Sequence, residues 1–245
     1  MGILVTLSME NNMALPLTEH PLIDVYVHSL DREVKFRPFL VKEEKLLVLA
    51  NETKDQSEMI KATQQVVTNC SFGEVMGDEI PVFDMQNIFL ELRKVSISDT
   101  VNIRLVCGHC EKSMDVDLSL DAFKLNKTEG HSKEFSIAED ISLEMRYPTA
   151  TELAELGKSE TENDIYRVAE KCIEKIYYGD VILDEDALNP EEREEFVNNL
   201  TSEQFVHIKN FFETMPVIEN TIEYKCASCE KENTAYLNGY YDFFV

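Results

Sequence analysis

The chain is short of basic residues and has no long apolar segment. It carries 23 Lys and Arg against 47 Asp and Glu, which gives a formal net charge of −24 at pH 7. Phosphate backbones and anionic membrane surfaces repel a chain of this charge. No apolar run approaches the roughly 20 residues that a helix needs to span a bilayer. The composition therefore argues against both nucleic acid and a membrane as partners.

The sequence also lacks the patterns of common catalytic sites. Its eight glycines are scattered singly, so no glycine-rich loop is present to hold phosphate groups. Its five histidines stand in no spacing typical of a metal hydrolase or a catalytic triad. The first residues have no basic region and make a poor secretory signal. We expect no enzyme and no small-molecule substrate.

A pair of cysteines separated by two residues occurs twice in the same frame. Segments Ile103–Lys112 and Ile222–Lys231 both have an apolar, strand-like approach, then the cysteine pair, then Glu-Lys. Two such pairs supply four thiolates, and zinc favours four thiolates at about 2.3 Å in a closed tetrahedron. Because a closed shell leaves no position for water, this metal is expected to be structural. The predicted zinc ligands are Cys107, Cys110, Cys226 and Cys229.

Three alternatives to one shared zinc site are open. A redox role is disfavoured, because neither pair begins a helix after a buried strand. Two separate metal sites would recruit His109 and either His131 or His207. Cysteine pairs without metal are the third alternative. The two other cysteines, Cys70 and Cys172, occupy apolar positions of helix-like patterns, which favours inert thiols in a reducing compartment.

The hydrophobic period changes from helical to alternating and back along the chain. It predicts an α+β fold with a small antiparallel zinc-ribbon-like sheet, a helical N-terminal segment, and a helical insertion between the two cysteine knuckles. The expected segments are 1–12 as an extension, 13–99 as a hairpin plus helices, 100–148 as the first half of the ribbon sheet, 149–216 as the helical insertion, and 217–245 as the second half.

Three local predictions concern the helices. Asp84 is a candidate N-cap of a helix that follows Pro81. Apolar residues at helical spacing predict one helix from Asp164 to Tyr178. Nine acidic residues and only one basic residue lie in 180–203. That segment is either a solvated acidic face or an electrostatic guide for a basic partner.

Four sequence blocks carry a resemblance to a known family. They are Met13–Pro21, Lys35–Leu47, Pro81–Arg93 and Met145–Thr149. Together with both cysteine pairs, they resemble the baseplate hub assembly proteins of T-even-like, contractile-tailed bacteriophages. The resemblance covers residues 13–245, and residues 1–12 depart from it.

The resemblance implies a non-enzymatic role in building the baseplate hub in the host cytoplasm, with other hub or hub-assembly proteins as partners. Such a protein is either a chaperone-like factor that leaves, or a permanent subunit that keeps a large apolar interface in the virion. A third function, from another class, is a zinc-ribbon binder of nucleic acid or of the transcription machinery. It would need basic residues beside the knuckles, where glutamates offset the basic ones here.

Two apolar stretches are candidate partner-binding surfaces. The first consists of Phe36, Arg37, Phe39 and Leu40. Its alternative is a helix entry that packs on its own hairpin. The second is the aromatic C-terminus with Tyr240, Tyr241, Phe243 and Phe244. Its alternative is a strand that contributes to the core.

Overall fold

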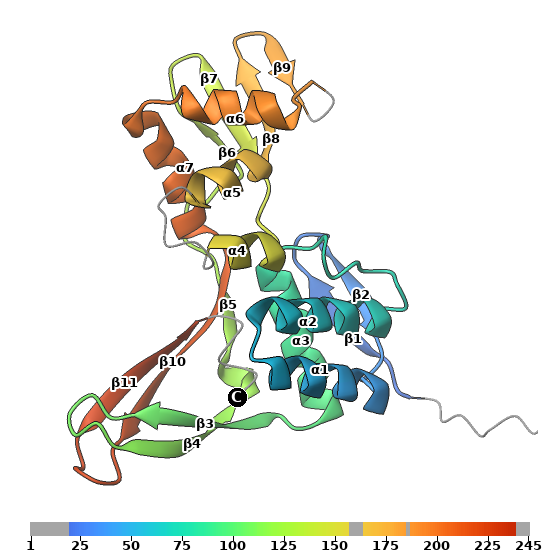
Figure 1. The fold of residues 1–245 in the computed structure, drawn as a ribbon, viewed down its shortest axis with the longest axis vertical. Coiled ribbons are helices and arrows are strands. Elements are labelled where there is room, and N and C mark those ends of the chain that lie inside the picture. Colours follow the sequence, from blue (N-terminus) through green and yellow to red (C-terminus); the bar gives the residue numbers. More distant parts are fainter. Residues whose placement is uncertain (1–19, 157–163, 185–186, 239–245) are drawn as a thin grey trace, which may run out of the picture.

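The computed structural model describes residues 20–156, 164–184 and 187–238 of a mixed α/β protein (Figure 1). The described part contains seven α-helices and several small antiparallel sheets, so the predicted α+β class is confirmed at this level. Its buried apolar side chains form three clusters. These clusters hold together an N-terminal lobe, a distal lobe, and the base of two hairpins that carry the cysteines.

In the N-terminal lobe, a two-stranded hairpin packs on helices. Successive side chains of a strand point to opposite faces, so alternate residues of both strands are buried against the helices. Helix α2 is amphipathic and buries a stripe that includes Met59 and Val66. The elements of this lobe are β1 (Ile23–Val27), β2 (Arg32–Phe36), α1 (Val41–Thr53), α2 (Gln56–Cys70) and α3 (Val82–Ser96).

Asp84 does not cap its helix, and that prediction is wrong. The N-cap of α3 is Pro81, and the Asp84 side chain is fully buried in the first turn. Its two carboxylate oxygens accept hydrogen bonds of 2.8 Å from the backbone N–H groups of His28 and Ser29. These donors satisfy a carboxylate that burial would otherwise destabilise. Asp84 therefore fastens the turn of the β1–β2 hairpin to α3.

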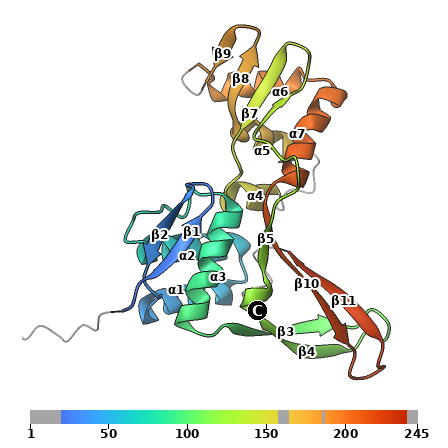
Figure 2. The ribbon, with the colours of Figure 1, turned by 180° about the vertical axis from the view of Figure 1, so that it is seen from behind.

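The cysteine pairs lie at the tips of two further hairpins. The first hairpin is a two-stranded sheet, whereas the second shares its inner strand with β5. Leu120, Ile218 and other buried apolar residues join the two hairpins at their base. Both views show the hairpins leaving the body separately and converging at their tips (Figure 2). The strands are β3 (Thr100–Val106), β4 (Ser113–Ser119), β5 (Lys124–Asn126), β10 (Val217–Lys225) and β11 (Glu232–Asn238).

The distal lobe is a four-stranded antiparallel sheet with helices against one face (Figure 1). It draws two strands from 100–148 and two from 149–216, so the boundary predicted at residue 148 cuts through this sheet. The insertion is therefore not purely helical. Helix α4 (Ala150–Leu156) leads into this lobe, but its Ala150 and Ala154 belong to the core of the N-terminal lobe. The elements of the distal lobe are β6 (Glu134–Ser136), β7 (Ile141–Met145), α5 (Asp164–Cys172), β8 (Ile173–Tyr178), β9 (Val181–Leu183), α6 (Pro190–Asn198) and α7 (Ser202–Thr214).

The single helix predicted for 164–178 is wrong in its second half. Helix α5 ends at Cys172, and the chain continues directly as β8, which pairs with β7. The register of this pair shifts between Glu144 and Met145. A bulge of this kind lets Ile173 and Ile176, three residues apart, both point into the core. Their helix-like spacing therefore arises from an irregular strand.

Candidate metal centre

The four predicted ligands meet where the two hairpin tips converge. The Sγ atoms of all four cysteines lie within 4.8 Å of one another. Two of these separations are 3.7 Å between Cys107 and Cys229 and 3.6 Å between Cys110 and Cys226. Both are far longer than a disulfide bond of about 2.05 Å. They match the spacing of about 3.8 Å that a tetrahedron with zinc–sulfur bonds of about 2.3 Å requires.

The two knuckles have the same backbone geometry. In the first, the N–H of Cys107 donates to the carbonyl of Lys112 at 3.0 Å, and the N–H of Glu111 donates to the carbonyl of Cys107 at 2.9 Å. Glu111 has a left-handed backbone, with φ of 59°, which turns the chain back into the next strand. The second knuckle repeats these features at Cys226, Lys231 and Glu230. The sequence repeat is therefore also a structural repeat.

Backbone N–H groups at the knuckles point at sulfur atoms. The N–H of His109 lies 3.4 Å from the Sγ of Cys107 and holds the pKa of that thiol at about 6. The N–H of Ser228 makes the equivalent contact to Cys226. A backbone N–H lowers the pKa of Cys110, but burial and the three neighbouring sulfurs raise it to about 11. Four thiolates at this spacing therefore need a cation to balance their charge, and the donor set fits a soft, tetrahedral metal ion.

Side chains outside the sulfur cluster join the two hairpins directly. Lys112 donates from Nζ to Oγ of Ser228 at 2.8 Å. The N–H of Gly108 donates to Oδ1 of Asn233 at 3.0 Å. The Tyr224 hydroxyl donates to the backbone carbonyl at position 106, also at 3.0 Å. These bonds orient the tips so that the four sulfurs face one point.

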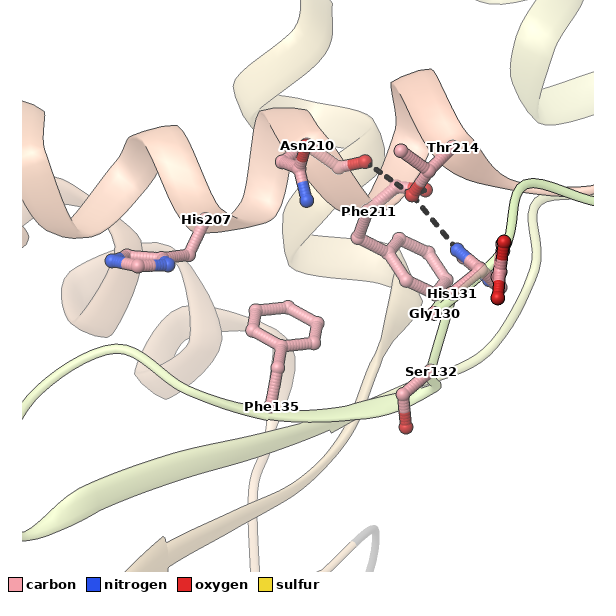
Figure 3. Close-up of a pocket in the computed structure, with 9 residues that line it drawn as sticks. Gly130, His131, Ser132, Phe135, His207, Asn210, Phe211 and Thr214 are labelled. Atoms are coloured by element: carbon pink, nitrogen blue, oxygen red, sulfur yellow. Dashed lines mark hydrogen bonds between the residues drawn. The ribbon is translucent and has the colours of Figure 1, made fainter.

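The alternative of two metal sites does not match the positions of the histidines. His131 and His207 line a pocket of the distal lobe, away from the hairpin tips (Figure 3). Both ring nitrogens of His131 contact other side chains, namely Thr214 and Tyr147. Within the described residues, the four cysteines are the one group with metal-ligand geometry. This geometry shows where a metal ion could bind.

Comparison with known proteins shows the family to which the chain belongs. The sequence profile of one family, described as T4 bacteriophage base plate protein, matches residues 20–245. The chain belongs to this family. No curated protein and no solved structure matches this chain. Membership of this family confirms the predicted resemblance to baseplate proteins of T4-like phages. It supports a structural or assembly role of the chain in the baseplate.

The predicted contact block of the base plate protein is not an exposed surface. Phe36 is fully buried and Phe39 is 7% exposed, and both belong to the core of the N-terminal lobe. Arg37 forms an ion pair of 2.9 Å with the buried carboxylate of Glu43, and Leu40 is half-buried at the start of α1. The expectation of exposure is therefore wrong for both phenylalanines. The predicted contacts Tyr240, Tyr241, Phe243 and Phe244 lie outside the described residues.

A pocket in the distal lobe was not predicted from the sequence. It has a volume of about 290 Å³, and the rings of Phe135 and Phe211 form one wall (Figure 3). His131 bridges the lobe here, with Nδ1 at 2.9 Å from Oγ1 of Thr214 and Nε2 at 3.1 Å from the hydroxyl of Tyr147. The lining comes from the loop 129–132 and strand β6 on one side and from α7 on the other, which are distant in sequence. No sequence motif joins them, so only the tertiary structure shows the pocket.

Among the described helices, none has the length and apolarity needed to cross a bilayer.

The half-buried position of His131 predicts a pH-dependent stability. Burial, and secondarily the charge of Lys127, lower the pKa of His131 below its ordinary value. Glu129 lines the same pocket as His131, and the ring of Tyr147 stacks on the ring of His131. Because the unfolded chain binds the proton more readily, stability is retained above about pH 6.5 and falls as the pH drops below that value.

Urea unfolding of the wild type and of His131→Gln between pH 8 and pH 5 measures this effect. The stability advantage of the wild type over the variant should shrink as the pH falls through about 6.5. An advantage that is constant over this range would contradict the prediction. His207→Gln is the control, because His207 lies on the same pocket and its side chain is exposed.

Proposed function

We propose that this base plate protein is a non-enzymatic factor for assembling the hub of the phage baseplate. It acts in the host cytoplasm through contacts with other hub or hub-assembly proteins, and a structural zinc ion stabilises it. The observation that carries the proposal is family membership over nearly the whole described chain, together with the sequence blocks that resemble hub-assembly proteins. The chain's strong negative charge keeps it from the packaged genome.

The four-sulfur cluster supports a structural role for the metal. Cys107, Cys110, Cys226 and Cys229 would fill all four positions of a tetrahedral zinc ion and leave none for water or substrate. The ion would fasten the β3–β4 hairpin to the β10–β11 hairpin, which is the last element of the described chain. The metal therefore shapes the molecule, while other surfaces bind partners.

A nucleic-acid-binding function is disfavoured by the charges near the knuckles. Arg104, on the strand that leads to the first knuckle, is held by the carboxylate of Asp115 at 2.8 Å. Lys112 is directed to Ser228 at the second knuckle. These basic groups therefore have partners within the chain.

Two measurements test whether the protein leaves the baseplate. Affinity purification of the tagged chain from infected cells should recover other hub proteins before tails are complete. Quantitative mass spectrometry of purified particles should find the chain well below the level of the hub subunits. Stoichiometric presence in particles would contradict the transient role and establish the alternative, a permanent subunit of the hub. Failure to recover any hub protein would contradict the hub assignment itself.

A further inference from the structure

The free end of the distal lobe exposes a cluster of apolar side chains. Tyr178, Val181 and Ile182 are 55%, 52% and 58% exposed. They lie at the turn between β8 and β9, where Tyr178 pairs with Val181 and residue 177 pairs with Ile182. Single exposed apolar residues are ordinary, but exposed apolar side chains that pair across the free end of a hairpin mark a contact surface.

The register shows which faces of the sheet these residues occupy. Leu143, Ile176 and Leu183 are paired across three strands and pack in the core under the helices. Two residues further along, Tyr178 and Val181 point to the same face but lie beyond the buried core. Ile182 points to the opposite face. In the described chain β9 is an edge strand, so its outer side is also open to a partner.

An acidic helix lies beside this apolar end. Helix α6 crosses the face of the sheet to which Tyr178 and Val181 point, close to β8 and β9 (Figure 1). Its carboxylates at Glu191, Glu194 and Glu195 are exposed, and no ion pair within the described residues neutralises them. Burial, and secondarily the charge of Glu194, raise the pKa of the nearby Glu170 against the opposing charges of Arg167 and Lys171. The one basic residue of this helix, Arg193, is half-buried.

We propose that the distal end, defined as Tyr178, Val181 and the outer face of α6, binds a basic amphipathic segment of another protein. The apolar side of such a segment covers the hairpin tip, and its basic side faces the α6 carboxylates. A second copy of this chain would bring the same carboxylates together and carries a net charge of −24, so it is disfavoured. The surface is remote from the metal centre, and the proposal does not depend on whether the protein stays in the virion.

Photo-cross-linking in infected cells tests the proposal. The photoreactive residue p-benzoylphenylalanine is placed at position 181, and in a matched control at Phe72, which is 66% exposed in the N-terminal lobe. Position 181 should give a discrete protein adduct that position 72 does not give. Sequencing of the cross-linked peptide should show a segment with net positive charge and apolar residues at helical or alternating spacing.

Charge reversal on α6 supplies the second measurement. It should lower the adduct yield about tenfold, since complementary charges control the association of such surfaces. Glu192 is left intact because it completes the capping box with Asn189. The test variant is Glu191→Lys, Glu194→Lys and Glu195→Lys. The control variant has the same charge change on exposed carboxylates of the N-terminal lobe, Glu33→Lys, Glu44→Lys and Glu52→Lys.

Any of four results would overturn the proposal. They are no adduct at position 181 above that at position 72, an acidic or neutral cross-linked segment, a cross-link to nucleic acid or to a second copy of this chain, and a yield unchanged by the α6 variant. Circular dichroism and metal content of both variants confirm that loss of the adduct does not come from misfolding.

Discussion

Replacing Cys107 with serine is expected to remove zinc from the protein and to loosen its C-terminal hairpin. The variant takes one thiolate from a four-sulfur cluster whose members all lie within 4.8 Å. Structural zinc contributes about 10–16 kcal/mol in peptide systems. A whole domain is stable by only about 5–15 kcal/mol. Elemental analysis should find one zinc per wild-type chain and well under half in the variant, and hydrogen exchange should speed up in β10 and β11.

Two matched variants show whether one shared site exists. Cys226→Ser should lose as much zinc as Cys107→Ser, because both sulfurs would bind the same ion. With two separate sites, each variant would keep the other site's metal. His109→Ala is the control, since its side chain is exposed and lies outside the sulfur cluster. Full zinc content and stability in Cys107→Ser would contradict the four-thiolate site.

Replacing Arg37 with methionine should destabilise the N-terminal lobe by about 3–5 kcal/mol, because it leaves a buried charge without its partner. The Glu43 side chain is 1% exposed. Burial raises the pKa of Glu43, but the Arg37 guanidinium and the backbone N–H of Leu40 outweigh it and hold that pKa below its ordinary value. The carboxylate accepts from Arg37 at 2.9 and 3.3 Å and from that N–H at 3.0 Å. Chemical unfolding measures the loss.

A double variant and a surface pair provide the comparison. Arg37→Met with Glu43→Leu should recover most of the lost stability, because both charges are then absent. Arg104→Met removes an exposed ion pair with Asp115 and should cost far less stability than Arg37→Met. If Arg37→Met costs as little as Arg104→Met, the buried pair does not stabilise the lobe as proposed.

The sequence by itself determined the elements whose signals are local. The two cysteine pairs predicted the sulfur cluster, since two residues between cysteines suffice to aim both side chains at one point. Alternating side chains in β3 and β4 predicted that hairpin. Asn189 and Thr201 are of the residue types that favour helix N-caps, and their side chains accept the N3 hydrogen bonds at the starts of α6 and α7. Each knuckle, strand pattern and helix start depends on residues within a few positions of one another, and the repeated frame of the two knuckles indicated that they share one site.

Only the tertiary structure decided the features that depend on distant partners. Ile173 and Ile176 fitted a helix until a bulge beside Met145 placed both in a strand. Asp84 resembled a helix cap until the hairpin turn at His28 supplied two N–H donors. Phe36 looked available to a partner but packs in the core. In each case the local pattern allows two conformations of similar energy, and burial against a remote segment selects one of them.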